Sequence, residues 1–128
     1  MNRHVTVGLA MVAGAAIGAA AVQSLHAQSK PPVYYVAEID FTNAEGYLKE
    51  YAPRQGALVR ESGGRFLVAG GKTTVFEGDA PKSRFTVTVW DSLEKIQAWR
   101  SSAAYKELRT IGDKYAKFRS FAVEGVSN

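Results

Sequence analysis

The sequence contains no cysteine, and its only two histidines, His4 and His26, lie within the first 26 residues. The chain therefore forms no disulfide and carries no cysteine to which a lipid could be attached. Its later part lacks the side chains required by zinc sites, histidine-ligated haem, Ser-His-Asp triads and Cys-His pairs. The acidic residues show no spacing typical of an all-oxygen metal loop. We therefore expect no metal and no cofactor.

Charge of one sign is not concentrated in any segment. The chain has 16 Lys and Arg residues against 12 Asp and Glu residues, a net charge of +4. Most basic residues have an acidic neighbour within a few positions, whereas a nucleic-acid-binding surface needs basic side chains gathered on one face. The pattern favours a mixed-charge, solvated surface and no nucleic-acid partner.

The first 27 residues are typical of a secretory signal peptide. Arg3 gives a positive start, Val5 to Val22 is uncharged and mostly small or aliphatic, and Ala27 supplies the small residue at a cleavage site. We expect residues 1–27 to be removed, leaving a periplasmic or secreted protein with no membrane association. The alternative is a retained N-terminal membrane anchor, because the uncharged run is about as long as the roughly 17–25 residues that span a bilayer.

A short linker (residues 28–32) precedes one domain, residues 33–128. Such a domain buries only a modest core, so oligomerisation would stabilise it. Alternating apolar residues predict strands over 33–41, 65–69, 84–90 and 117–126.

Helix signals lie between these strands. Helices are predicted to begin at three capping residues: Asn43, Ser92 and Ser102. Gly63 should end the first helical segment, and Pro53 should divide it into two pieces. The order is that of the α+β, ferredoxin-like βαββαβ fold: a four-stranded antiparallel sheet with its first and third strands central and helices on one face.

Two glycine pairs, Gly63-Gly64 and Gly70-Gly71, raise the question of a phosphate-binding loop. A dinucleotide-binding loop has the order strand, glycines, helix, whereas the first pair here follows a predicted helix and precedes a strand. Gly71-Lys72-Thr73 has the final letters of a P-loop, but no helix is predicted after it. The glycines therefore indicate ends of elements rather than a nucleotide site.

Six stretches in this order, "YYVAEID", "GGRFLVAGG", "EGD", "FTVTVWDSLEK", "SSAAY" and "VEGV", resemble the family catalogued as domain of unknown function 1330 (DUF1330). The resemblance covers about Tyr34 to Val126. It implies the dimeric α/β-barrel superfamily, in which two ferredoxin-like sheets pack face to face in a homodimer. Relatives in that superfamily include cofactor-independent monooxygenases and muconolactone isomerases. Family members often carry Arg just before the second glycine pair, where this chain has Ala69.

The candidate site follows from assigning sheet faces. We expect the helices to cover the more apolar face, which includes Ile39 and Val87. We expect the first and third strands to be parallel neighbours, so that the other face carries the candidate site residues: Tyr34, Glu38, Arg84, Thr88 and Trp90. The alternative is that this face is filled by dimer contacts.

Each candidate has an expected role. Glu38 is the candidate catalytic acid or base, unless it pairs with a base across the dimer or reaches solvent. Arg84 could bind an anionic group bidentately; the alternative is a surface arginine at the end of a strand. Tyr34 and Trp90 would form ligand walls, with Thr88 in support; packing in a dimer interface is the alternative use of such aromatics.

Three functions fit these observations. The first is non-catalytic binding of a small molecule in a cleft of a homodimer. The second is a cofactor-independent enzyme, an isomerase or monooxygenase, acting on a small aromatic or lactone-like compound. The third is a purely structural homodimer. The fold alone does not choose among them, because function depends on the site.

Overall fold

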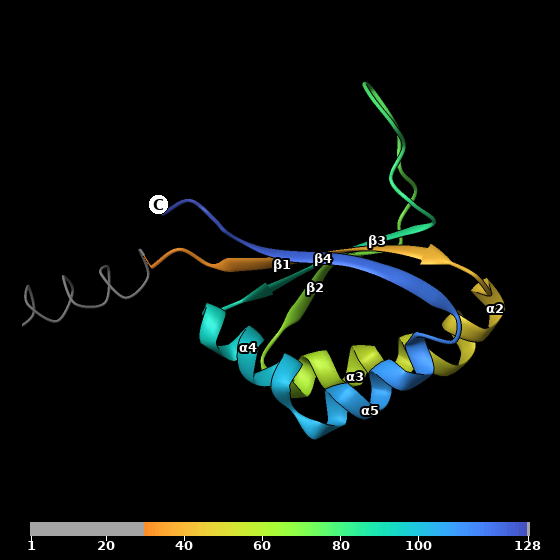
Figure 1. Cartoon of the computed structure of the whole chain (residues 1–128). Coiled ribbons are helices and arrows are strands. Elements are labelled where there is room, and N and C mark those ends of the chain that lie inside the picture. The colour runs from red at the N-terminus through yellow and green to blue at the C-terminus, as the bar shows by residue number, and fades with distance from the viewer. Residues whose placement is uncertain (1–29, 128) are drawn as a thin grey trace, which may run out of the picture. The chain divides into compact units, whose positions relative to one another are not determined.

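The computed structural model describes residues 30–127, of which Pro32–Val126 form one compact unit (Figure 1). The predicted signal peptide, residues 1–27, lies outside the described residues, and so does most of the predicted linker. Within the described part of the chain, no helix is long and apolar enough to cross a membrane.

The elements follow the predicted order. They are β1 (Val33–Phe41), α2 (Ala44–Gly46), η1 (Tyr47–Tyr51), α3 (Ala52–Ser62), β2 (Arg65–Ala69), β3 (Arg84–Trp90), α4 (Leu93–Ser101), α5 (Ala103–Gly112) and β4 (Ala116–Glu124). The strands form one sheet in the order β2-β3-β1-β4. This confirms the α+β, ferredoxin-like fold.

All neighbouring strands are antiparallel, including the central pair β1 and β3. The expectation that β1 and β3 are parallel is therefore wrong. The helical crossover makes β2 run in the same direction as β1. Strand β3 lies between them and runs the opposite way, so it is antiparallel to both.

The predicted helix ends are confirmed. Three residues accept a hydrogen bond through their side chains from a backbone N–H three residues further on: Asn43, Ser92 and Ser102. Gly63 ends α3 with a φ of 109°, a left-handed conformation that glycine adopts without steric cost.

The break in the first helical segment that was expected at Pro53 lies about one turn earlier. Tyr47–Tyr51 form a π-helix, in which the Ala52 N–H bonds to the Tyr47 carbonyl. Pro53 then falls in the first turn of α3, where its missing N–H costs no hydrogen bond. The chain therefore runs from α2 into α3 without a turn between them.

All helices of residues 30–127 cover one face of the sheet, and none of them covers the other, which we call the open face (Figure 1). Val33 lies opposite Trp90 and Tyr35 lies opposite Thr88, so these side chains share the helix-covered face. Trp90 is 1% exposed and Thr88 is also buried. The expectation that the helices cover the face of β3 that carries its apolar residues is therefore wrong. The apolar residues of β3 lie on the open face: Phe85, Val87 and Val89.

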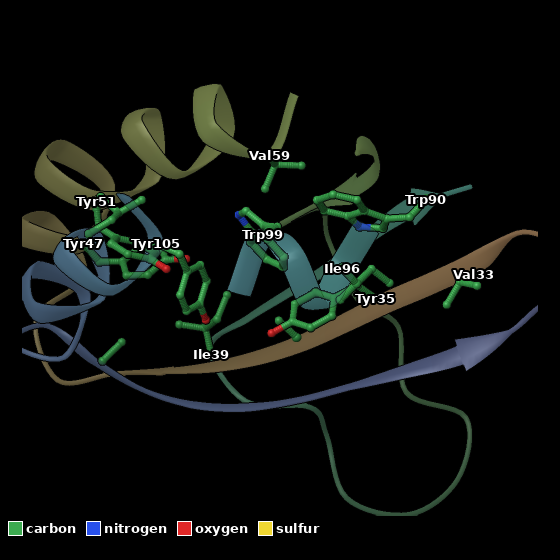
Figure 2. Close-up of a cluster of buried hydrophobic side chains, with 13 residues drawn as sticks. Val33, Tyr35, Ile39, Tyr47, Tyr51, Val59, Trp90, Ile96, Trp99 and Tyr105 are labelled. Carbon is green, nitrogen blue, oxygen red and sulfur yellow. The ribbon is translucent and has the colours of Figure 1, made fainter. Parts of the chain in front are cut away.

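The core between the sheet and the helices is aromatic. Figure 2 shows Trp99 of α4 lying between Trp90 and Tyr105. The Trp99 ring centroid is 5.0 Å from those of Trp90 and Tyr35 and 4.9 Å from that of Tyr105. The indole N–H of Trp90 donates to the Thr88 hydroxyl at 2.8 Å, which explains how a polar pair can be buried here.

Candidate functional site

The five predicted site residues do not share a surface. Tyr34 and Glu38 lie on the open face of the sheet, whereas Arg84, Thr88 and Trp90 lie on the helix-covered face. Thr88 and Trp90 are closed into the core, so neither lines a cleft on the open face. Glu38 faces Phe85 and Arg119 on its two neighbouring strands. The five residues therefore do not line one face of this sheet.

Arg84 instead lines a half-enclosed pocket between α3 and the strands β2 and β3. Its volume is about 150 Å³, a size at which a buried cavity can hold a single six-membered ring. Its lining residues are Tyr47, Ala52, Gln55, Gly56, Arg60, Phe66, Ala69, Arg84 and Thr86. Ala69, where family members often carry Arg, therefore borders this pocket.

A second, deeper cavity adjoins this pocket and shares Tyr47, Gln55 and Thr86 with it. Its free volume of about 20 Å³ is room for about one water molecule. The walls are mostly aromatic: Tyr35, Tyr51, Trp99, Tyr105 and Phe118. We call the two together the internal cavity.

The Arg84 side chain is placed by two neighbours. Its guanidinium carbon lies 5.8 Å from the Tyr47 ring centroid. Gly70 has a φ of 74°, and a Cβ there would lie 2.5 Å from an Arg84 guanidinium nitrogen. Gly70 therefore both permits the turn after β2 and leaves room for Arg84.

Two buried donors at the internal cavity have no hydrogen-bond partner within residues 30–127. They are the Nε atom of Arg84 and the indole Nε1 of Trp99. Arg84 also makes no ion pair within 4.0 Å in this part of the chain. Most buried polar atoms in proteins are hydrogen-bonded, so the unpaired donor of Arg84 beside the larger pocket favours an acceptor group on a ligand.

A network of arginines and tyrosines closes the other side of the cavity. Arg100 donates to the hydroxyls of Tyr35 at 2.6 Å and Tyr105 at 2.9 Å. Arg109 donates to Tyr105 at 3.0 Å and to Asp113 at 2.8 Å. These bonds fix the tyrosine rings that line the deeper cavity.

The tyrosines of the π-helix stay protonated at neutral pH. Burial raises the pKa of Tyr47 to about 12, although Arg84 nearby lowers it, and burial also raises the pKa of Tyr51. Both side chains, four residues apart on one helical face, line the deeper cavity, and π-helical turns of this kind are frequent at functional sites. Within the described residues, no Asp, Glu, His or Cys lines either part of the internal cavity. Its chemistry is therefore that of hydrogen-bond donors around an aromatic space.

Sequence reasoning missed most of this cavity. The sequence pattern assigned none of five lining residues to a site: Tyr47, Tyr51, Gln55, Trp99 and Tyr105. The available signal was Gln55, a polar residue on the helical face that also carries Tyr51.

The βαββαβ order and the four-stranded antiparallel sheet define a protein of the ferredoxin-like α+β class. Residues 32–126 match the model of the family described as "Domain of unknown function (DUF1330)", and the chain belongs to this family.

Solved structures share the fold at low sequence identity. A protein of unknown function from Rhodopseudomonas palustris is 12% identical with a TM-score of 0.61, over 77% of this chain and 85% of that one. SnoaB, a cofactor-independent oxygenase from Streptomyces nogalater, is 14% identical with a TM-score of 0.57, over 77% and 96%. A hypothetical protein from Arabidopsis thaliana is 16% identical with a TM-score of 0.58, over 79% and 94%. A search of curated proteins gave no match.

Proposed function

We propose that the protein binds a small molecule in the internal cavity of each protomer of a homodimer, without catalysis. The observation that carries this proposal is the unpaired buried Nε donor of Arg84, a residue that lines the larger pocket. A buried donor without a partner costs about 1–3 kcal/mol, and a ligand acceptor would remove that cost.

The ligand class follows from the lining. Among the described residues Arg84 has no carboxylate partner, which favours an anionic group on the ligand. The aromatic walls and the volume of about 150 Å³ favour a planar body of about one ring. A small aromatic carboxylic acid combines these properties, with the carboxylate at Arg84 and the ring directed toward the deeper cavity.

Binding is favoured over catalysis because the cavity lacks a group that would remove a proton at neutral pH. The one predicted acid or base, Glu38, lies on the opposite face of the sheet. A cofactor-independent enzyme is the second candidate, supported by the shared fold with the oxygenase SnoaB. Conversion of a bound compound to a product would favour this candidate.

The homodimer is proposed from the open face of the sheet. That face is apolar along three strands, through Val36, Val87 and Phe121, and no helix of the described residues covers it. Phe121 is 49% exposed. A second copy packed on this face would bury these side chains and should remove more than about 1,000 Å² of total surface from water.

The test is a comparison of acids with their neutral counterparts. Benzoate and phenylacetate are titrated by calorimetry beside benzamide and toluene, into the wild type, Arg84→Ala and the control Arg54→Ala, an exposed arginine on α3. We expect the acids alone to bind, and Arg84→Ala to weaken binding about 10- to 100-fold, because hydrogen bonds to charged groups contribute about 1.5–3 kcal/mol. Equal binding of neutral compounds, or no effect of Arg84→Ala, would contradict the proposal.

Export is also proposed, on the uncharged run that precedes Ala27. The expected outcome is a soluble mature protein that begins at or near Gln28, determined by N-terminal sequencing. Recovery of Met1 in a membrane fraction would instead support the retained anchor.

A further inference from the structure

The connection between β2 and β3 is far longer than the hairpin requires. The ladder of these strands reaches Gly70, whose N–H donates to the Phe85 carbonyl at 3.0 Å. A hairpin can turn in roughly two to five residues, yet residues 70–83 extend beyond it. We call residues 70–83 the arm. Loops of this length in compact domains usually have a function of their own.

The arm presents apolar side chains to solvent. Figure 1 shows it projecting from the sheet on the side opposite the helices, which is the side of the open face. Phe76 is 91% exposed, and with Val75, Pro81 and Phe85 it lines a hollow of about 460 Å³. Because it is so exposed, the Phe76 ring gains almost no stabilisation from burial within its own protomer.

The charges of the arm and of the sheet edge are opposite. Glu77 and Asp79 follow Phe76 on the arm, and both are exposed. Lys117 and Arg119 lie exposed on the open face of the edge strand β4. Within residues 30–127 none of these four side chains makes an ion pair within 4.0 Å.

We infer that the arm clasps a second copy of this chain. Phe76 packs against the partner protomer, and Glu77 and Asp79 pair with Lys117 and Arg119 of the partner subunit. The inference rests on the homodimer of the proposed function, because only a second copy on the open face brings a partner's β4 within reach of the arm. By two-fold symmetry each contact forms twice.

The test is a charge-reversal cycle read as the dimer dissociation constant in sedimentation equilibrium. Glu77→Lys with Asp79→Lys should weaken the dimer about tenfold, through loss of attraction and new repulsion at the rim. Lys117→Glu with Arg119→Glu should weaken it too. All four substitutions together should restore much of the wild-type affinity. This rescue is decisive, because Lys117 and Arg119 also lie opposite Asp40 and Glu38 of their own sheet.

Phe76→Ser provides an independent variant, with Leu48→Ser as its control on the helix side, where Leu48 is also exposed. Phe76→Ser should weaken the dimer at least tenfold and the control should not. A wild type that is monomeric at every concentration overturns the homodimer itself. A wild-type dimer that tolerates Phe76→Ser, or a charge cycle without rescue, overturns only the clasp. Loss of binding to phosphatidylcholine vesicles in Phe76→Ser, with the dimer unchanged, would assign the arm to a membrane instead.

Discussion

The two faces of strand β3 reverse the usual relation between polarity and burial. On β3 the helix-covered face carries Thr86, Thr88 and Trp90, whereas the open face carries Phe85 and Val87. The polar face can be the core because helix α4 brings Trp99 over it and because Thr88 satisfies the Trp90 indole. An apolar face that its own chain leaves uncovered indicates a partner, and a polar face under helices provides groups for a ligand.

The largest effect should come from removing the centre of the helix-covered face. Trp90→Ala deletes a side chain that is 1% exposed and should lower the free energy of unfolding by about 3–5 kcal/mol. Urea denaturation measures it, with Phe121→Ala on the open face as the comparison. A loss below about 1 kcal/mol for Trp90→Ala would contradict the assignment of this face as the core.

A charge on the open face should break the dimer and leave the protomer folded. Val87→Asp would bury an unpaired carboxylate in the proposed interface, and we expect a dimer at least 100-fold weaker, about 2.7 kcal/mol. Light scattering on dilution measures assembly, and circular dichroism checks the fold. Leu48→Asp on the helix side is the matched control. An unfolded Val87→Asp protomer would place this residue in the core instead.

High pH should destabilise the packing under the helices through its buried tyrosines. The pKa of Tyr47 is raised from 10.0 to about 12 by burial, so its contribution to stability is complete below pH 10 and is lost as the pH rises toward 12. The loss amounts to about 1.4 kcal/mol per pH unit. Tyr47→Phe should flatten the dependence of unfolding free energy on pH above 10. Parallel curves for the variant and the wild type would contradict this account.

The smallest effect should come from adjacent glycines of the arm. Gly70→Ala places a side chain at a φ of 74° and against Arg84, and should cost about 1–2 kcal/mol and weaken binding of an aromatic acid. Gly71→Ala meets no atom within 4 Å and should change stability by less than about 0.5 kcal/mol. Thermal denaturation and ligand titration of the two variants measure the difference. Equal behaviour would show that Gly70 does not position Arg84.

The sequence predicted the elements better than the faces. The bounds of β1, β2 and β3 and the caps Asn43 and Ser92 could be predicted because alternation and capping are local. The last strand was predicted to end at Val126, but it ends two residues earlier, at Glu124.

The face of β3 could not be predicted because both of its sides suit burial. Val87 and Val89 favour a core, but so does Trp90, and only the register with β1 decides which side the helices cover. The candidate site depended on that choice, so Arg84 was expected beside Glu38 on one face. The internal cavity also depends on tertiary packing, since it joins Gln55 of α3 to Thr86 of β3 and Trp99 of α4.

Native mass spectrometry of the protein purified from its own organism tests the division of roles between the two faces most directly. The account predicts a wild-type dimer with one small molecule per protomer, an Arg84→Ala dimer without that molecule, and a Val87→Asp monomer. A wild-type monomer, or an Arg84→Ala dimer that keeps the molecule at the wild-type level, would contradict it.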